Sequence, residues 1–152
     1  MINSFPPIAN SETHILIIGS MPSIASLEAT EYYAHPKNHF WRLINDFFHE
    51  GKEWSSYEEK KNCLSEHHIG LWDALKKCER KGSLDSAICQ AVPNDFKTFF
   101  KKYPSVQILL FNGISAFKFF KKYHLDLLKE KRFKYIPREY FSQELKEVGE
   151  YV

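Results

Sequence analysis

The chain has 152 residues, a net charge of +2, and 43% hydrophobic against 26% charged residues. This length and balance predict a soluble globular protein with a single domain over residues 1–152. The low net charge says little about binding partners, and no apolar run is long enough to cross a bilayer.

The first half of the chain contains two predicted strands and two predicted helices. The run HILIIG (14–19) is apolar, β-branched and ended by glycine, which is typical of a buried strand. Apolar residues at helical spacing predict a helix over 39–50, and Gly51 is a plausible stop. Ser56 followed by Glu59 forms a capping-box pattern that begins a second helix. The apolar run 69–75 predicts a short buried strand, and a polar loop follows it.

The second half repeats this alternation. Pro93 near the start, Asn94 or Asp95 as cap, and Pro104 after the end predict a helix within 92–104. A strand over 105–113, a helix over 114–128 and a last strand over 132–137 complete the pattern.

Strands that alternate with helices predict an α/β protein whose mostly parallel sheet is covered on both faces. Ligands of such sheets bind outside the carboxyl ends of the strands. Residues 19–21, Asp73 and residues 112–113 all follow predicted strands. We therefore expect them to converge on one rim, beneath the segment 20–39.

The stretch LIIGSMPSIASLEATEYYAHPKNHFW (16–41) closely resembles the first motif of DNA-deoxyinosine glycosylases, the hypoxanthine-excising branch of the uracil-DNA glycosylase superfamily. The resemblance continues through GLWDALKKCERKGSLDSAI, AVPNDF and ILLFNG, and covers about residues 13–123. It implies a three-layer α/β/α sandwich around a four-stranded, mostly parallel sheet. The family's second motif, expected after about residue 137, is not recognisable in REYFSQELKEVGEYV.

The resemblance makes Asn38 the catalytic residue. Its amide carbonyl can hold a water beneath the sugar, and hydrolysis of a nucleoside bond then needs positioning and electrostatics more than a strong base or nucleophile. On residue type alone, Asn38 is instead an N-cap of the following helix. Both roles can hold together.

Further residues are assigned to the base and the DNA backbone. The first motif also resembles, more loosely, that of the mismatch-specific uracil-DNA glycosylases. Tyr33 matches the aromatic position of that family, which implies stacking on the base, although adjacent tyrosines are also common in half-buried positions. Small residues let main chain approach base edges at Gly19, Ser20 and Met21. Asn112 is placed at the pocket floor or in a plain strand-exit turn. Candidate phosphate-binding residues are Lys37, Arg80, Lys81 and Ser83.

Other polar residues favour structural roles. Asp73 is interpreted as a residue that hydrogen-bonds the rim loops or caps a turn. The cysteines, Cys63, Cys78 and Cys89, have no metal-ligand spacing. We therefore expect no metal and no cofactor.

The leading hypothesis is a monofunctional DNA glycosylase that hydrolyses the N-glycosidic bond of deaminated bases, hypoxanthine first and then uracil or xanthine. A flipped base is the substrate of such an enzyme, and DNA is its partner. The resemblance implies a monomer without membrane contact, and the N-terminus lacks a secretory signal, so we expect a cytoplasmic enzyme. The alternative is a catalytically weak or silent nucleic-acid-binding member. Without the second motif, activity on duplex DNA is expected to be weak, and single strands to be better substrates.

Overall fold

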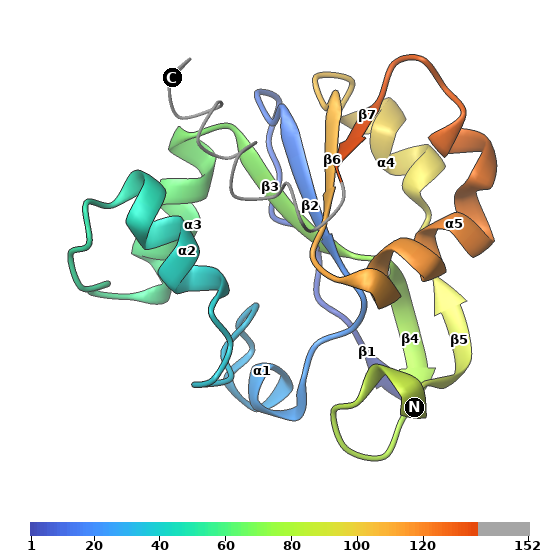
Figure 1. Ribbon diagram of the computed structural model, residues 1–152, viewed down its shortest axis with the longest axis horizontal. Coiled ribbons are helices and arrows are strands. Elements are labelled where there is room, and N and C mark those ends of the chain that lie inside the picture. The colour runs from blue at the N-terminus through green and yellow to red at the C-terminus, as the bar shows by residue number, and fades with distance from the viewer. Residues whose placement is uncertain (137–152) are drawn as a thin grey trace.

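A parallel four-stranded sheet forms the centre of the molecule in the computed structural model, which describes residues 1–136 (Figure 1). Its strand order is β3-β2-β6-β7, and each neighbouring pair is parallel. The strands are β2 (Ile15–Gly19), β3 (Ile69–Asp73), β6 (Ile108–Phe111) and β7 (Lys134–Ile136). The predicted parallel sheet is confirmed.

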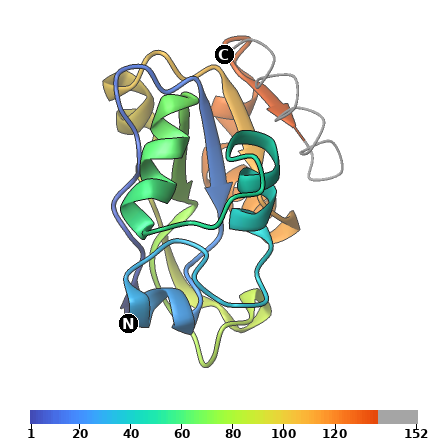
Figure 2. The same ribbon diagram turned by 90° about the vertical axis from the view of Figure 1, so that its left-hand side faces the viewer.

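Helices cover both faces of this sheet (Figures 1 and 2). Ile15 and Ile17 of β2 pack against α2 (Phe40–Phe48) and α3 (Tyr57–Glu66). The alternate residues Leu16 and Ile18 pack against α4 (Phe96–Lys102) and α5 (Ile114–Leu128). Successive side chains of a strand point to opposite faces, so β2 is apolar throughout because both of its faces are buried. The α/β/α sandwich is thereby confirmed.

Two helix starts follow the capping signals in the sequence. The side chain of Ser56 accepts a hydrogen bond from the Glu59 amide at 3.1 Å, which satisfies an otherwise unpaired donor of α3. Asp95 caps α4 in the same way, through the amide of Thr98 at 3.1 Å. The helix predicted within 92–104 therefore begins later, at Phe96, and Pro93 ends a strand instead.

A second, antiparallel sheet flanks the polar loop that the sequence predicted over 78–88. The strands on both sides of this loop were not predicted, and residues 78–79 belong to the first of them. This sheet has the order β1-β4-β5 and consists of β1 (Ile2–Asn3), β4 (Leu75–Glu79) and β5 (Cys89–Pro93). In β4, Leu75 and Cys78 are buried while Lys76 and Glu79 are exposed. Because these strands leave several residues exposed, their sequence is as polar as that of a loop.

Two short helices connect these elements. α1 (Ile24–Ala29) lies inside the long first motif, and the 3₁₀ helix η1 (Asp85–Ala87) lies between β4 and β5. No helix within residues 1–136 is long and apolar enough to cross a membrane. The segment in which the second motif was sought, from about residue 137, lies outside the described residues.

Candidate active site

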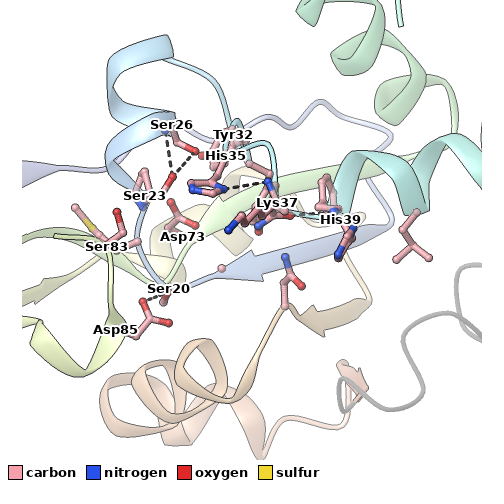
Figure 3. A pocket seen from close by; sticks show the side chains of 18 residues that line it. Ser20, Ser23, Ser26, Tyr32, His35, Lys37, His39, Asp73, Ser83 and Asp85 are labelled. Atoms are coloured by element: carbon pink, nitrogen blue, oxygen red, sulfur yellow. Dashed lines mark hydrogen bonds between the residues drawn. The ribbon is translucent and has the colours of Figure 1, made fainter. Parts of the chain in front are cut away.

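A cavity of about 540 Å³ opens at the carboxyl ends of β2, β3 and β6 (Figure 3). The three predicted strand ends therefore meet at one rim, as parallel-sheet topology requires. The segment 20–39 arches over this rim, and the end of β4 with its following loop closes the other side. The lining residues are Gly19, Ser20, Met21, Pro22, Ser23, Ser26, Tyr32, Tyr33, His35, Lys37, Asn38, His39, Phe40, Leu43, Asp73, Ser83, Asp85 and Asn112.

Most residues assigned from the sequence lie in this lining. Those that line the cavity are Asn38, Gly19, Ser20, Met21, Tyr33, Asn112, Lys37 and Ser83. Arg80 and Lys81 are not among the lining residues. The contacts of all these residues with the base and the phosphates stay predictions.

Asn38 sits in a tight turn directly before α2. Its backbone amide donates to the carbonyl of His35 at 2.9 Å, and its Oδ1 accepts from the Phe40 amide, also at 2.9 Å. The N-cap position of α2 is His39, which makes no side-chain cap bond, so the N-cap interpretation of Asn38 is wrong by one residue. Asn38 instead closes a turn to the amide two residues on, directly before the helix. A carbonyl oxygen has two lone pairs, so this bond leaves Oδ1 capacity for a second donor such as a water.

Tyr33 reaches the cavity from a strained backbone position. Its φ is +54°, in the left-handed region that aromatic residues seldom adopt. The ring centroid lies 4.3 Å from that of Phe40, which is buried, and its hydroxyl comes close to Gly19. Packing against a fixed core residue holds the tyrosine ring in place on the cavity wall.

Hydrogen bonds within the first motif fix the arch that carries these residues. The Ser23 hydroxyl caps α1 by accepting from the Ser26 amide, and Ser26 Oγ accepts from the Ala34 amide at 3.0 Å. The indole of Trp41 donates to the carbonyl of Tyr32 at 2.7 Å. The small residues, the tyrosines and the aromatic pair of this motif thus build one rigid loop anchored in the core.

Asp73 is the residue whose position departs most from the interpretation made from the sequence. Its side chain lines the cavity at 3% exposure, and its Oδ2 has no hydrogen-bond partner in the described part of the chain. Burial, and to a smaller extent the nearby Asp85, raise the pKa of this carboxyl to about 7, although the positive charge of Arg80 acts in the opposite direction. The strand-end rule placed Asp73 at the rim, and only the tertiary structure shows that its carboxyl faces the cavity.

The loop after β4 is bound to the first motif by side-chain contacts. Ser20 Oγ donates to Asp85 at 2.8 Å, and the Ile24 amide donates to Ser83 Oγ at 2.9 Å. The Arg80 guanidinium donates to the carbonyls of Pro22, at 2.6 Å, and Gly82, at 2.7 Å. Asp85 was not identified from the sequence, because no local pattern connects it with a serine 65 positions away.

We expect Arg80→Gln to act through the loop and not through the DNA backbone. Losing two bonds to carbonyls should reduce the free energy of unfolding by about 1–3 kcal/mol, since hydrogen bonds from charged groups are the stronger ones. The salt dependence of DNA binding should stay unchanged, whereas Lys81→Ala, at an exposed position, should reduce the salt slope by about 1. Fluorescence anisotropy with a short oligonucleotide at several salt concentrations measures both slopes. A reduced slope for Arg80→Gln would instead favour the predicted phosphate contact.

The fold and the site define an α/β protein with a cavity at the carboxyl ends of its parallel strands. No group of three His, Cys, Asp or Glu side chains within residues 1–136 is placed to hold a metal. The chain matches the uracil DNA glycosylase superfamily over residues 6–148, and it belongs to that superfamily.

Two named relatives and one solved structure are similar to this chain over most of its length. A hypoxanthine DNA glycosylase of Methanosarcina acetivorans is 39% identical over 112 residues, which are 74% of this chain and 71% of that protein. A protein of the same name from Methanosarcina barkeri is 37% identical over 109 residues, 72% of this chain and 69% of the relative. The solution structure of a candidate uracil DNA glycosylase from M. acetivorans superposes with a TM-score of 0.78 at 31% identity, covering 98% of this chain and 96% of that one.

Proposed function

We propose that this protein is a monofunctional DNA glycosylase that releases deaminated bases, hypoxanthine first, by hydrolysing the N-glycosidic bond. Membership of the superfamily and two curated relatives with this activity in their names support the proposal. The observation that carries it in this chain is the cavity at the strand ends, with the amide of Asn38 and the ring of Tyr33 on its wall.

The proposed reaction needs a bound water and a stabilised leaving group. The water oxygen forms a bond to C1′ of the sugar while the bond between C1′ and the base nitrogen breaks, and the base keeps the electron pair. Asn38 Oδ1 orients the water by accepting a hydrogen bond from it. The water's proton passes to solvent or to the departing base. An amide is too weakly basic to remove that proton early, so the sugar carries most of the positive charge in the transition state.

Tyr33 and the backbone around Gly19 serve the base in this proposal. Stacking on an aromatic ring suits any nucleobase, because every base has a flat π-face. The cavity lies beneath the surface, so a base in a duplex must rotate out of its stack to enter it, at a cost of a few kcal/mol. Lys37 and Ser83 lie in the lining and are proposed to contact phosphates flanking the flipped nucleotide.

A silent nucleic-acid-binding role is not favoured. The relatives named as glycosylases share more than a third of their aligned residues with this chain. The residue assigned to the water also lines a cavity large enough for a purine.

Base release is tested with oligonucleotides that carry a single hypoxanthine, uracil or xanthine, as single strands and as duplexes. We expect alkali-labile abasic sites on the hypoxanthine strand, with the single strand cleaved faster than the duplex because no base pair has to open. Unmodified oligonucleotides are the control. Absence of abasic sites on every modified substrate, with a folded protein, would contradict the proposed function.

A further inference from the structure

The carboxyl group of Asp73 is buried in the cavity and has no role in the water-holding step. Its main chain is fixed from behind, since its carbonyl accepts from Asn94 Nδ2 at 2.7 Å, and the next amide donates to the Gly19 carbonyl at 2.7 Å. Oδ1 lies against Gly19, where a Cβ would approach it to 2.5 Å. Oδ2 has no partner in residues 1–136. A buried polar atom without a partner is costly, so this oxygen is held ready for a ligand.

The charges around Asp73 do not neutralise an ionised carboxylate. Asp85, from η1, adds a second negative charge, and the Arg80 guanidinium is bound to two backbone carbonyls. From the segment 31–39, the titratable or charged side chains that line the cavity are Tyr32, Tyr33, His35, Lys37 and His39. Asp73 forms no ion pair with any described residue. A buried carboxyl in such surroundings favours its neutral form.

We propose that Asp73 binds, as a neutral carboxylic acid, the lactam edge that deaminated bases share. Deamination replaces an amino group by a carbonyl and leaves a neighbouring ring N–H, so hypoxanthine, uracil and xanthine all present C=O beside N–H. The carboxylic acid donates its O–H to that carbonyl and accepts from the N–H, which satisfies the unpaired oxygen. This inference rests on the proposed function and names the group that recognises the substrate.

The protonation state also affects the chemistry. The departing base carries negative charge, part of which is delocalised onto its carbonyl oxygen. An O–H donor aimed at this oxygen stabilises the transition state, whereas an ionised carboxylate repels it. Base release by the wild-type protein should therefore decline as the pH rises through about 7, the pKa of Asp73.

The decisive variant is Asp73→Asn, since an asparagine amide keeps one donor and one acceptor in nearly the same shape but does not titrate. We expect Asp73→Asn to retain activity on a single-stranded hypoxanthine substrate. It should not show the decline of the wild type between pH 6.5 and pH 8.5, over which the neutral fraction of a carboxyl with a pKa of about 7 falls about 25-fold. Asp73→Ala should lose about 10- to 200-fold in kcat/KM at every pH. Asp85→Asn should move the wild-type decline to lower pH, because a neighbouring negative charge is removed. Asp126→Asn, at an exposed position on α5, is the matched control with an unchanged profile.

Two results would overturn the inference. A folded Asp73→Asn that is inactive at pH 6 would mean that the carboxylate acts as an anion or base. Equal rates for Asp73→Ala and wild type would mean that it does not touch the base. If the wild type releases no base at all, the proposed function fails, and binding of free hypoxanthine by calorimetry at pH 6 and pH 8.5 then decides the inference. Binding that weakens with pH in the wild type but not in Asp73→Asn supports it, and no difference overturns it.

Thermal unfolding checks the protonation state without any substrate. Because folding raises the pKa of Asp73 from 3.8 to about 7, the folded protein binds more protons than the unfolded chain between these values. The contribution of Asp73 to the stability of the fold is therefore greatest at pH values below 3.8, and it is lost as the pH rises from 3.8 through about 7. The melting temperature of Asp73→Asn relative to wild type should therefore increase from pH 5 to pH 8. A constant difference would contradict the neutral carboxyl.

Discussion

Replacement of Asn38 by alanine is expected to reduce base release from a hypoxanthine-containing single strand by about 10²–10³-fold, the loss typical of removing one positioned hydrogen-bonding group from a transition state. The reason is that no other side chain has been assigned to hold the attacking water. Single-turnover kinetics with excess enzyme measures the chemical step directly. DNA binding should change little, because an uncharged amide contributes nothing to the salt-dependent part of the affinity.

The hydrogen bond from the Phe40 amide to Asn38 Oδ1 requires its own control. Asn38→Ala removes this acceptor, at a cost of about 1 kcal/mol in stability, which by itself can shift the turn before α2. Asn38→Ser keeps a hydroxyl acceptor for the Phe40 amide but is too short to hold a water in the cavity. We expect Asn38→Ser to fold like the wild type and to be as inactive as Asn38→Ala. A serine variant within threefold of the wild-type rate would show that Asn38 only stabilises the turn.

Replacement of Gly19 by alanine is the second change with a large expected effect. A methyl group there would place its carbon 2.5 Å from Asp73 Oδ1 and 2.8 Å from the Tyr33 hydroxyl, closer than atoms in contact can lie. Both side chains must then move, and these two residues are assigned to the edge and the face of the base. We expect a loss of at least about tenfold in kcat/KM, together with roughly 1–3 kcal/mol in stability from overpacking.

Gly51→Ala separates the loss of activity from a general loss of stability. Gly51 has a φ of +71°, and no atom lies within contact distance of the position that a Cβ would take there. It is not among the residues that line the cavity. Alanine there costs about 1–2 kcal/mol of backbone strain, but displaces no cavity residue. Chemical denaturation and base release should show Gly51→Ala as less stable and fully active. Gly19→Ala with wild-type activity would mean that Asp73 and Tyr33 do not need their present positions.

Local sequence patterns predicted the central sheet and its helices because their causes are local. The run of apolar residues from Ile15 to Ile18 is buried on both faces, and such a run, rich in β-branched residues and ended by glycine, is typical of a central strand in a parallel sheet. Cap residues such as Ser56 and Asp95 act on amides three positions away, so a short window contains the whole interaction. The small antiparallel sheet was not predicted because β4 and β5 contain many polar, exposed residues. The two strands pair across the loop between them, and no short stretch of sequence contains both partners.

The residues of the site also fall into those that the sequence predicted and those that only the structure revealed. The sequence alone determined that three strand ends meet at one rim and that the first motif, including Tyr33 and Asn38, lies over it, because topology and a long specific motif are properties of the chain itself. Only the tertiary structure decided that Asp73 lines the cavity with an Oδ2 that has no partner within residues 1–136, and that Arg80 binds the carbonyl of Pro22. Desolvation and long-range contacts set both outcomes. These depend on which atoms surround a group after folding, and residue type and spacing do not contain that information.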